Sequence, residues 1–191
     1  MTSRRILILG AVTVLAAGFA WLLFVTLPAA YRRSTRPATG AGAPAAPVTP
    51  GRKIKAHLFY VADDGTRLTD LERDVPFGEG TVEQARQILE AQIAPAIEPL
   101  VSAVPPGTKL RTLFVTERGE AFVDFSNELV TRHSGGSTDE ILTVYTIVDV
   151  LTANLPAVTS VQLLVEGKQI ETLAGHVDLS RPLAKNLTWV Q

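Results

Sequence analysis

Asp124 and Ser126 lie two residues apart in the stretch "FVTERGEAFVDFSNEL" and are the pair whose types come nearest to catalytic chemistry. A serine nucleophile needs a general base close to its hydroxyl, and an aspartate beside it does not replace that base. Short polar side chains at the end of a strand commonly bond nearby backbone and fix the exit of the chain. We therefore interpret both residues as structural. The alternative, a hydrolase, requires His133 or His176 to approach them.

Metal and acid–base sites are not indicated elsewhere in the sequence. The three histidines show no HxH or HExxH spacing, and they are His57, His133 and His176. An acidic cluster follows the first predicted strand but is interspersed with Arg67 and Arg73, which favours a solvated, ion-paired edge. Its members are Asp63, Asp64, Asp70, Glu72 and Asp74. The chain has no cysteine, so disulfides and thiolate sites are excluded. We expect no cofactor, no metal and no enzymatic activity.

The stretch around Asp124 is predicted to be a β-hairpin. A two-residue turn at Arg118-Gly119 would place Phe114 opposite Val123. One face of this hairpin is then predicted to carry Leu110, Phe114, Ala121, Val123 and Phe125. The opposite face would carry Asp124 together with an apolar group that we regard as a candidate partner-binding face. This group consists of Leu113, Val115 and Phe122.

Alternating and helical periodicities predict the remaining elements. "KIKAHLFYV" and the weaker "RLTDLERDVP" indicate two strands, and a second hairpin is expected to turn at Glu166-Gly167-Lys168, with Gly167 as its structural glycine. Helices are predicted to begin at capping boxes formed by Thr81 with Gln84 and by Ser137 with Glu140. The second helix is apolar on so many sides that it needs cover on more than one of them.

The expected fold is α+β, with a single antiparallel or mixed sheet and two helices packed on one of its faces. The element order is β(β)-α-β-β-α-β-β, a relative of the ferredoxin-like arrangement, preceded by a transmembrane helix. The predicted hairpin turn at Gly119, together with Asp124, Ser126 and Gly167, forms the structural motif of this fold.

A charge-free apolar run from Ile6 to Leu27 precedes the predicted domain. As a helix it would extend about 33 Å, enough to cross a hydrocarbon core of about 30 Å. A cleaved signal peptide is the alternative, although its apolar region normally spans only about 7–15 residues. We expect a membrane anchor at residues 1–33, a disordered Pro/Ala/Gly-rich linker at 34–51 and a folded domain at 52–191.

The charge of the chain is unevenly distributed. Residues 1–51 contain five of the 18 basic side chains and none of the 19 acidic ones, so residues 52–191 hold 13 basic and 19 acidic groups. This balance argues against a nucleic-acid partner, because phosphates need a concentrated basic surface. Basic residues flank both ends of the apolar run, so the positive-inside rule comes close to a tie and slightly favours a cytoplasmic domain.

Five stretches in this order resemble the GerMN domain family of sporulation and spore germination proteins. They are "HLFYVADDGTRL", "VPPGTKL", "GEAFVDFSNEL", "STDEILTVYTIVDVLTANLPAVTSVQLLVEG" and "LAGHVDLSRPL". The resemblance covers about Ile54 to Leu183 and implies a membrane-tethered α/β domain outside the cytoplasm without known catalysis, related to ring-building modules. Many family members are lipoproteins and some carry two copies of the domain, whereas this chain has no cysteine and one copy.

These observations together predict a single-pass protein of the bacterial inner membrane, with its domain in the periplasm. Its expected function is non-enzymatic protein–protein assembly in the cell envelope, by self-association or with other envelope proteins, linked to sporulation, germination or cell-wall processes. The alternative is a peptidoglycan- or glycan-binding module that uses exposed groups such as Tyr60 and Trp189.

Overall fold

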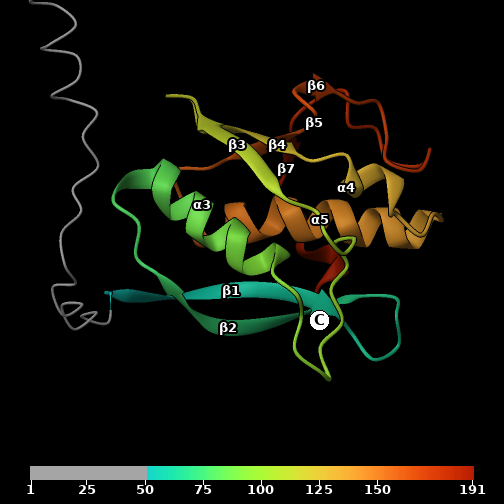
Figure 1. Ribbon diagram of the computed structural model, residues 1–191, viewed down its shortest axis with the longest axis horizontal. Helices are drawn as coiled ribbons and strands as arrows, with labels where there is room; N and C mark the ends of the chain where they lie inside the picture. The colour runs from blue at the N-terminus through green and yellow to red at the C-terminus, as the bar shows by residue number, and fades with distance from the viewer. Residues whose placement is uncertain (1–50) are drawn as a thin grey trace, which may run out of the picture. The chain divides into compact units, whose positions relative to one another are not determined.

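Two β-sheets lie on opposite sides of a pair of helices in the computed structural model, which describes residues 51–191 (Figure 1). The predicted transmembrane segment and most of the linker lie outside the described residues. Every helix within 51–191 is too short or too polar to serve as a membrane span. The elements are β1 (Lys53–Val61), β2 (Leu68–Pro76), α3 (Gly80–Ile93), β3 (Leu110–Val115), β4 (Glu120–Phe125), α4 (Glu128–Thr131), α5 (Ser137–Asn154), β5 (Ser160–Val165), β6 (Lys168–Gln169), β7 (Leu183–Ala184) and the 3-10 helix η2 (Leu187–Trp189).

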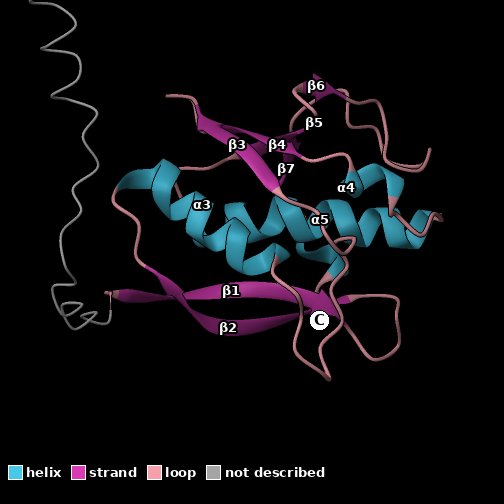
Figure 2. Cartoon of the chain, viewed as in Figure 1, coloured by secondary structure: helices cyan, strands magenta, loops and turns pink. Residues whose placement is uncertain are grey.

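The strands form a β/α/β arrangement, in which the helices separate a two-stranded sheet from a five-stranded one (Figure 2). The first sheet is the antiparallel β1–β2 hairpin, paired from Lys53↔Pro76 to Val61↔Leu68. In the second, the order is β3-β4-β5-β6 and β7 also pairs with β5. β4 and β5 are parallel, and the other pairs are antiparallel. The α+β class is confirmed, but the prediction of one sheet with both helices on one face is wrong.

Side-chain amides occupy the edge of β1 that a further strand would need. Gln92, near the end of α3, accepts a hydrogen bond from the Phe59 amide (2.8 Å) and donates one to the Phe59 carbonyl (2.7 Å). Asn154, at the end of α5, makes the same pair of bonds with His57 (2.8 and 2.7 Å). Buried backbone polar groups need such partners. Because helix side chains supply them, the β1–β2 hairpin does not continue into the larger sheet.

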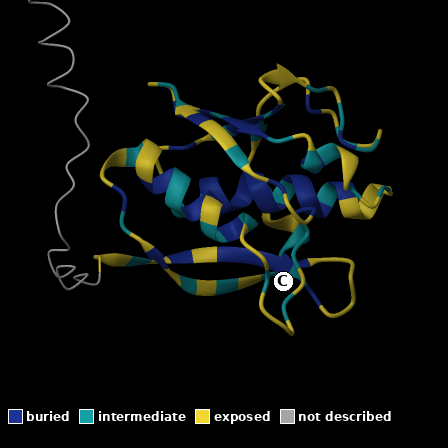
Figure 3. Ribbon diagram, in the orientation of Figure 1, coloured by how far each residue is buried: buried dark blue, intermediate teal, exposed yellow. Residues whose placement is uncertain are grey.

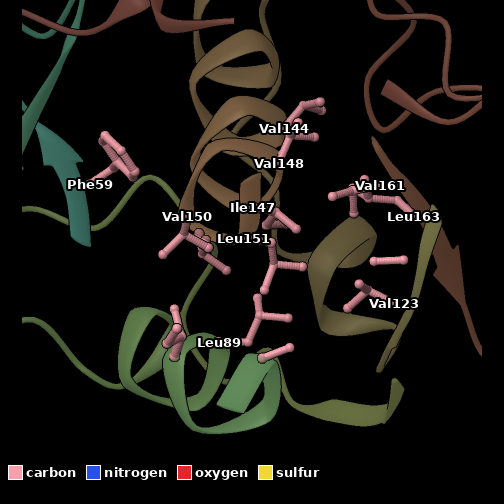
Figure 4. Packing of buried hydrophobic residues seen from close by; sticks show 14 of the residues in the cluster. Phe59, Leu89, Val123, Val144, Ile147, Val148, Val150, Leu151, Val161 and Leu163 are labelled. Atoms are coloured by element: carbon pink, nitrogen blue, oxygen red, sulfur yellow. The ribbon is translucent and has the colours of Figure 1, made fainter. Parts of the chain in front are cut away.

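Helix α5 is buried on nearly all sides, which explains its apolar composition (Figure 3). Val150 lies on the side of α5 that faces Phe59 of β1, whereas Val148 lies on the side that faces Val161 of β5 (Figure 4). The prediction that this helix needs cover on more than one side is therefore confirmed. Because of this two-sided burial, α5 supplies six of the buried hydrophobic core residues and β1 supplies four.

The predicted capping boxes do not form. α3 and α5 are preceded by Glu79 and Gly136, and neither residue caps the helix with its side chain. Gln84 accepts a hydrogen bond from the Gly78 amide (3.0 Å) beyond the helix start. Glu140 turns away from its own helix terminus and binds the loop after β6. Gln84 and Glu140 thus bind groups outside their helices in place of the first-turn amides that the spacing indicated.

Candidate functional site

The loop between β3 and β4 sets which side chains the hairpin presents. The Gly119 amide donates to the Thr116 carbonyl (3.0 Å), and the Thr116 amide donates to the Glu120 carbonyl (2.9 Å). This pattern is a three-residue hairpin loop with a glycine in the left-handed region, here at φ +83°. A Cβ at Gly119 would lie 2.7 Å from the Ala157 carbonyl oxygen, so the position also needs the absence of a side chain.

The extra loop residue changes the register from the predicted one. Leu113 pairs with Val123, and Phe114 pairs with Phe122. A shift of one residue moves each side chain to the other face of a strand. Leu113 is therefore in the core with 5% of its surface exposed, whereas Phe114 is 60% exposed.

The three residues of the predicted partner face consequently do not share a surface. Leu113 and Val115 point to the helix side, where Leu113 is buried and Val115 is half-buried against the core. Phe122 lies on the opposite side, beside Phe114. The prediction that these three residues form one face is wrong, because it assumed a two-residue turn.

The sheet surface that faces away from the helices carries an aromatic pair flanked by charges, and we call it the outer face. It consists of Thr112, Phe114 and Phe122, with Arg111 and Glu166 at one end and Arg118 and Glu120 at the loop end. The two end pairs are ion pairs with N···O distances of 3.6 Å and 3.5 Å, respectively. The outer face thus offers apolar area between two ends of mixed charge.

Asp124 joins three segments of the larger sheet. One carboxylate oxygen accepts a hydrogen bond from Arg111 Nη1 (2.9 Å), and the other accepts one from the Gly167 amide (2.7 Å). Gly167 and Glu166 both have positive φ, +74° and +52°, and form the two-residue turn between β5 and β6. Such turns require left-handed backbone at both positions. The predicted hairpin at this position is present, with a turn one residue shorter than expected.

Ser126 holds the start of β3 against the end of β4. Its Oγ accepts a hydrogen bond from the Lys109 amide (3.0 Å), and the Ser126 amide donates to the Lys109 carbonyl (2.9 Å). A hydrogen bond from the Ser126 hydroxyl is also the main cause that lowers the pKa of Glu128. Neither Asp124 nor Ser126 has a histidine among its hydrogen-bond partners within residues 51–191. The geometry required by the hydrolase alternative is therefore not present there.

The histidines lie apart and each has a local partner. His57 pairs with Asp70 at 2.9 Å, His133 Nε2 lies 3.2 Å from Thr143 Oγ1, and His176 Nδ1 lies 3.0 Å from Glu140 Oε2. In the part of the chain that the structure describes, no three His, Asp or Glu side chains are placed to hold a metal ion. Three members of the acidic cluster lie on β2 and pair across the hairpin, Asp70 with His57, and Glu72 and Asp74 with Lys55. The expected ion pairs with Arg67 and Arg73 are not formed among residues 51–191.

Two carboxylates on α5 are buried, Glu140 and Asp149, and neither role was predicted: the sequence indicated Glu140 as a capping residue and assigned no contact to Asp149. Burial acts to raise the pKa of Glu140, but the backbone amides of Ala174, His176, Leu173 and Val177 together outweigh it, so the pKa is lowered. The Oδ1 atom of Asp149 accepts a hydrogen bond from the backbone amide of Asn186 (2.9 Å), whereas its Oδ2 atom has no hydrogen-bond partner. Burial consequently raises the pKa of Asp149 to about 6, against the Asn186 hydrogen bond and the charge of Lys185.

These carboxylates attach the C-terminal segment to the core. Glu140 accepts hydrogen bonds from the amides of Leu173 (2.9 Å) and His176 (2.8 Å), and Asp149 holds residue 186. Acidic residues within an apolar helix were the sequence signal for this role. Their partners lie in a tail of little periodicity, so the sequence alone did not reveal them.

Comparisons with known proteins identify relatives of this domain. Residues 57–171 match the protein family described as "Germane: Sporulation and spore germination". No curated protein sequence matches the chain.

Solved structures that are similar to this chain include GerMN domains of a sporulation protein. The tandem GerMN domains of the sporulation protein GerM from Bacillus subtilis give a TM-score of 0.54 at 18% identity over 70% of this chain, which spans about half (46%) of that structure. The first GerMN domain of the same protein gives a TM-score of 0.53 at 23% identity, covering 69% of this chain and 97% of that one. A putative lipoprotein from Clostridium perfringens gives 0.49 at 21% identity, covering 72% and 90%. The two GerM structures share this fold.

Proposed function

The chain belongs to the Germane family of sporulation and spore germination, and on this premise we propose that residues 51–191 form a non-enzymatic assembly domain of the bacterial cell envelope. The domain lies outside the cytoplasm, is anchored by the segment Ile6–Leu27 and is held clear of the membrane surface by the proline-rich linker. Its function is to contact another GerMN domain through the outer face.

The aromatic pair on the outer face is the observation that carries this proposal. Phe114 is 60% exposed and lies directly opposite Phe122 on the neighbouring strand, so their rings adjoin on one surface. The helix side of the same two strands is buried in the core, with Leu113, Ala121 and Val123. Aromatic residues dominate the energetics of protein interfaces when they are central and become desolvated. Phe114 is placed to act as such an anchor.

A second copy of this domain is the partner that the charges of the outer face fit best. Each end of the face carries one arginine and one glutamate, Arg111 with Glu166 and Arg118 with Glu120. A two-fold interface brings the same patch of both subunits together and must be self-complementary. Mixed charges at both ends allow arginine to meet glutamate across such an interface.

Crosslinking of the cysteine-free chain tests this proposal. A cysteine introduced at Thr112, which is exposed beside Phe114, is treated with a bis-maleimide in native membranes that contain the full-length protein. We expect a crosslinked dimer, and Phe114→Glu should reduce its yield about tenfold because a charge replaces the central anchor. Ile97→Glu is the matched control, since Ile97 is 74% exposed but lies outside the outer face.

Two results would contradict this assignment. Equal dimer yields in the Phe114 and Ile97 variants would show that the outer face makes no contact. A crosslink to a different protein, with no dimer, would show that the outer face binds another protein and not a second copy of this domain.

Topology has its own test. A cysteine at Thr66, an exposed loop position between β1 and β2, should react with a membrane-impermeant thiol reagent in intact cells whose outer membrane, where present, is permeabilised. Labelling only after the inner membrane is disrupted would place the domain in the cytoplasm.

A further inference from the structure

A groove of about 560 Å³ lies between α5 and the C-terminal segment, away from the outer face. Its volume is within the range of about 300–1,000 Å³ that small-molecule sites occupy. Its lining includes Tyr145, His176, Asp178, Arg181, Asn186 and Trp189, together with apolar residues of α5 and the C-terminal segment.

Two aromatic side chains contribute to this lining from different elements. Tyr145 comes from the middle of α5, and Trp189 comes from η2 near the end of the chain. Both are half-buried, so each ring is supported by the core and still reaches the groove. Such rings offer flat apolar area with a polar tip, and they suit ligands that have one apolar and one hydrogen-bonding surface. By contrast, Tyr60, which the sequence suggested as an exposed group, is buried.

Polar groups of the groove are held in position by contacts outside it. Glu140 binds His176 at both its backbone amide (2.8 Å) and Nδ1 (3.0 Å), so Nε2 is directed away from this partner. Asn186 is attached to α5 through Asp149, and its Oδ1 accepts from the Thr188 amide (3.2 Å), which leaves the Nδ2 group as a donor. A few polar groups fixed in this way provide orientation and specificity in a binding pocket.

The charges in the groove compensate each other. Arg181 Nη2 lies 3.6 Å from Asp178 Oδ2, and both side chains are well exposed. A ligand with a strong charge of either sign would meet one of these groups unfavourably. The lining therefore favours a neutral ligand that is rich in hydroxyl and amide groups.

We propose that this groove binds an oligosaccharide containing N-acetylated amino sugars. The apolar face of a pyranose ring would stack on Tyr145 and Trp189, and hydroxyl groups would bond with His176, Arg181 and Asp178. The acetamido group has a methyl that fits the apolar lining and an amide that pairs with Asn186. This inference goes beyond the assembly function, since the two surfaces use different side chains.

The fluorescence of Trp189 reports directly on the groove. The chain has two tryptophans, so Trp21→Phe leaves Trp189 as the single indole in the full-length protein. Titration of this protein with chitotetraose should give a saturable change in emission. Maltotetraose, which lacks acetamido groups, and tetra-alanine serve as the saccharide and peptide controls.

Two arginine variants provide a matched comparison. Arg181→Ala should weaken chitotetraose binding about tenfold, the effect of one lost hydrogen bond to a charged group. Arg118→Ala should leave it unchanged. Both arginines are 84% exposed, and each contacts one carboxylate at 3.5–3.6 Å, but Arg118 lies on the hairpin loop of the outer face.

The outcomes separate this inference from the assembly proposal. No saturable change up to about 10 mM chitotetraose, or equal effects of the two arginine variants, would overturn it. An equal response to maltotetraose would contradict the acetamido assignment, and an equal response to tetra-alanine would assign the groove to peptides. Phe114→Glu should leave saccharide binding unchanged even where it abolishes the dimer.

Discussion

Replacing Asp149 by asparagine should stabilise the folded domain at neutral pH. Asp149 is completely buried, its Oδ2 has no hydrogen-bond partner, and its pKa is raised from 3.8 to about 6. A carboxyl group whose pKa is raised on folding contributes stability below its unfolded pKa of 3.8 and loses it as the pH rises through 6. Between a pH well below 3.8 and a pH well above 6, the contribution of Asp149 to the free energy of unfolding therefore falls by about 3 kcal/mol, because the pKa differs by about 2.2 between the folded and unfolded chain and each pKa unit corresponds to about 1.4 kcal/mol.

The Asp149→Asn variant removes this charge but keeps the main hydrogen bond. The amide oxygen of the introduced side chain can still accept from the Asn186 amide, whereas its NH₂ group needs an acceptor in the place of Oδ2. The Thr146 hydroxyl also has no partner and lies one helical turn away, so it can supply part of this acceptor. An unsatisfied donor costs about 1–3 kcal/mol, and we therefore expect a net gain of about 1–2 kcal/mol at pH 8.

The pH dependence is the more specific readout. Between pH 8 and pH 5 the protonation of Asp149 should stabilise the wild-type protein by about 1.4 kcal/mol, and the asparagine variant should lack this gain. Thermal unfolding of the full-length chain is followed by circular dichroism. The Tm advantage of the Asp149→Asn variant over the wild type should fall by about 3–5 °C from pH 8 to pH 5. Other titrating groups are shared by both proteins and cancel in the difference.

Asp64→Asn serves as the control for this experiment. Asp64 is exposed and the Thr66 amide and hydroxyl lower its pKa, so it does not titrate between pH 5 and 8. Its variant should differ from the wild type by the same amount at every pH in this range. If the Asp149 variant also gave a constant difference, the account of Asp149 as a group protonated near pH 6 would be refuted.

Two further predictions concern the backbone. Gly119→Ala should lower the free energy of unfolding by about 2–3 kcal/mol, whereas Gly135→Ala should cost only about 1 kcal/mol, because both have positive φ but only Gly119 faces a carbonyl oxygen at 2.7 Å. Gln92→Leu should cost about 2–4 kcal/mol by leaving the buried Phe59 amide and carbonyl unpaired, and Asn154→Ala should cost less because its bonds are nearer solvent. Chemical denaturation of each variant checks both comparisons, and equal costs within either pair would contradict the explanation.

Elements with strong periodicity were predictable from the sequence. The helix from Ser137 and its need for cover on several sides follow from apolar residues around its whole circumference. The two hairpins follow from glycine turns between apolar runs. What failed was the register at Phe114, because a loop of two residues and a loop of three both fit the letters "TERGE" and they give opposite faces.

The remaining features depend on partners far away in the sequence. Glu140 has the spacing of a capping residue, but its carboxylate binds the backbone amides of Leu173 and His176 and not an amide at the start of its own helix. Likewise, the separation into two sheets depends on Gln92 and Asn154 reaching β1 from two different helices. The groove was missed because eight of its ten lining residues come from a tail without hydrophobic periodicity. The hydrophobic periodicity and turn motifs of a short segment do not predict such contacts between residues far apart in the sequence.

The amide side chains that bind β1 fix the position of this strand relative to helices α3 and α5. Gln92 and Asn154 engage Phe59 and His57, which are two residues apart and present their peptide groups on the same edge. If the strand slid by a single residue, both amides would meet peptide groups that already bond with β2. A slide of β1 by one residue is therefore opposed at two helix ends simultaneously, and a residue inserted between His57 and Phe59 would prevent Gln92 and Asn154 from both binding the strand.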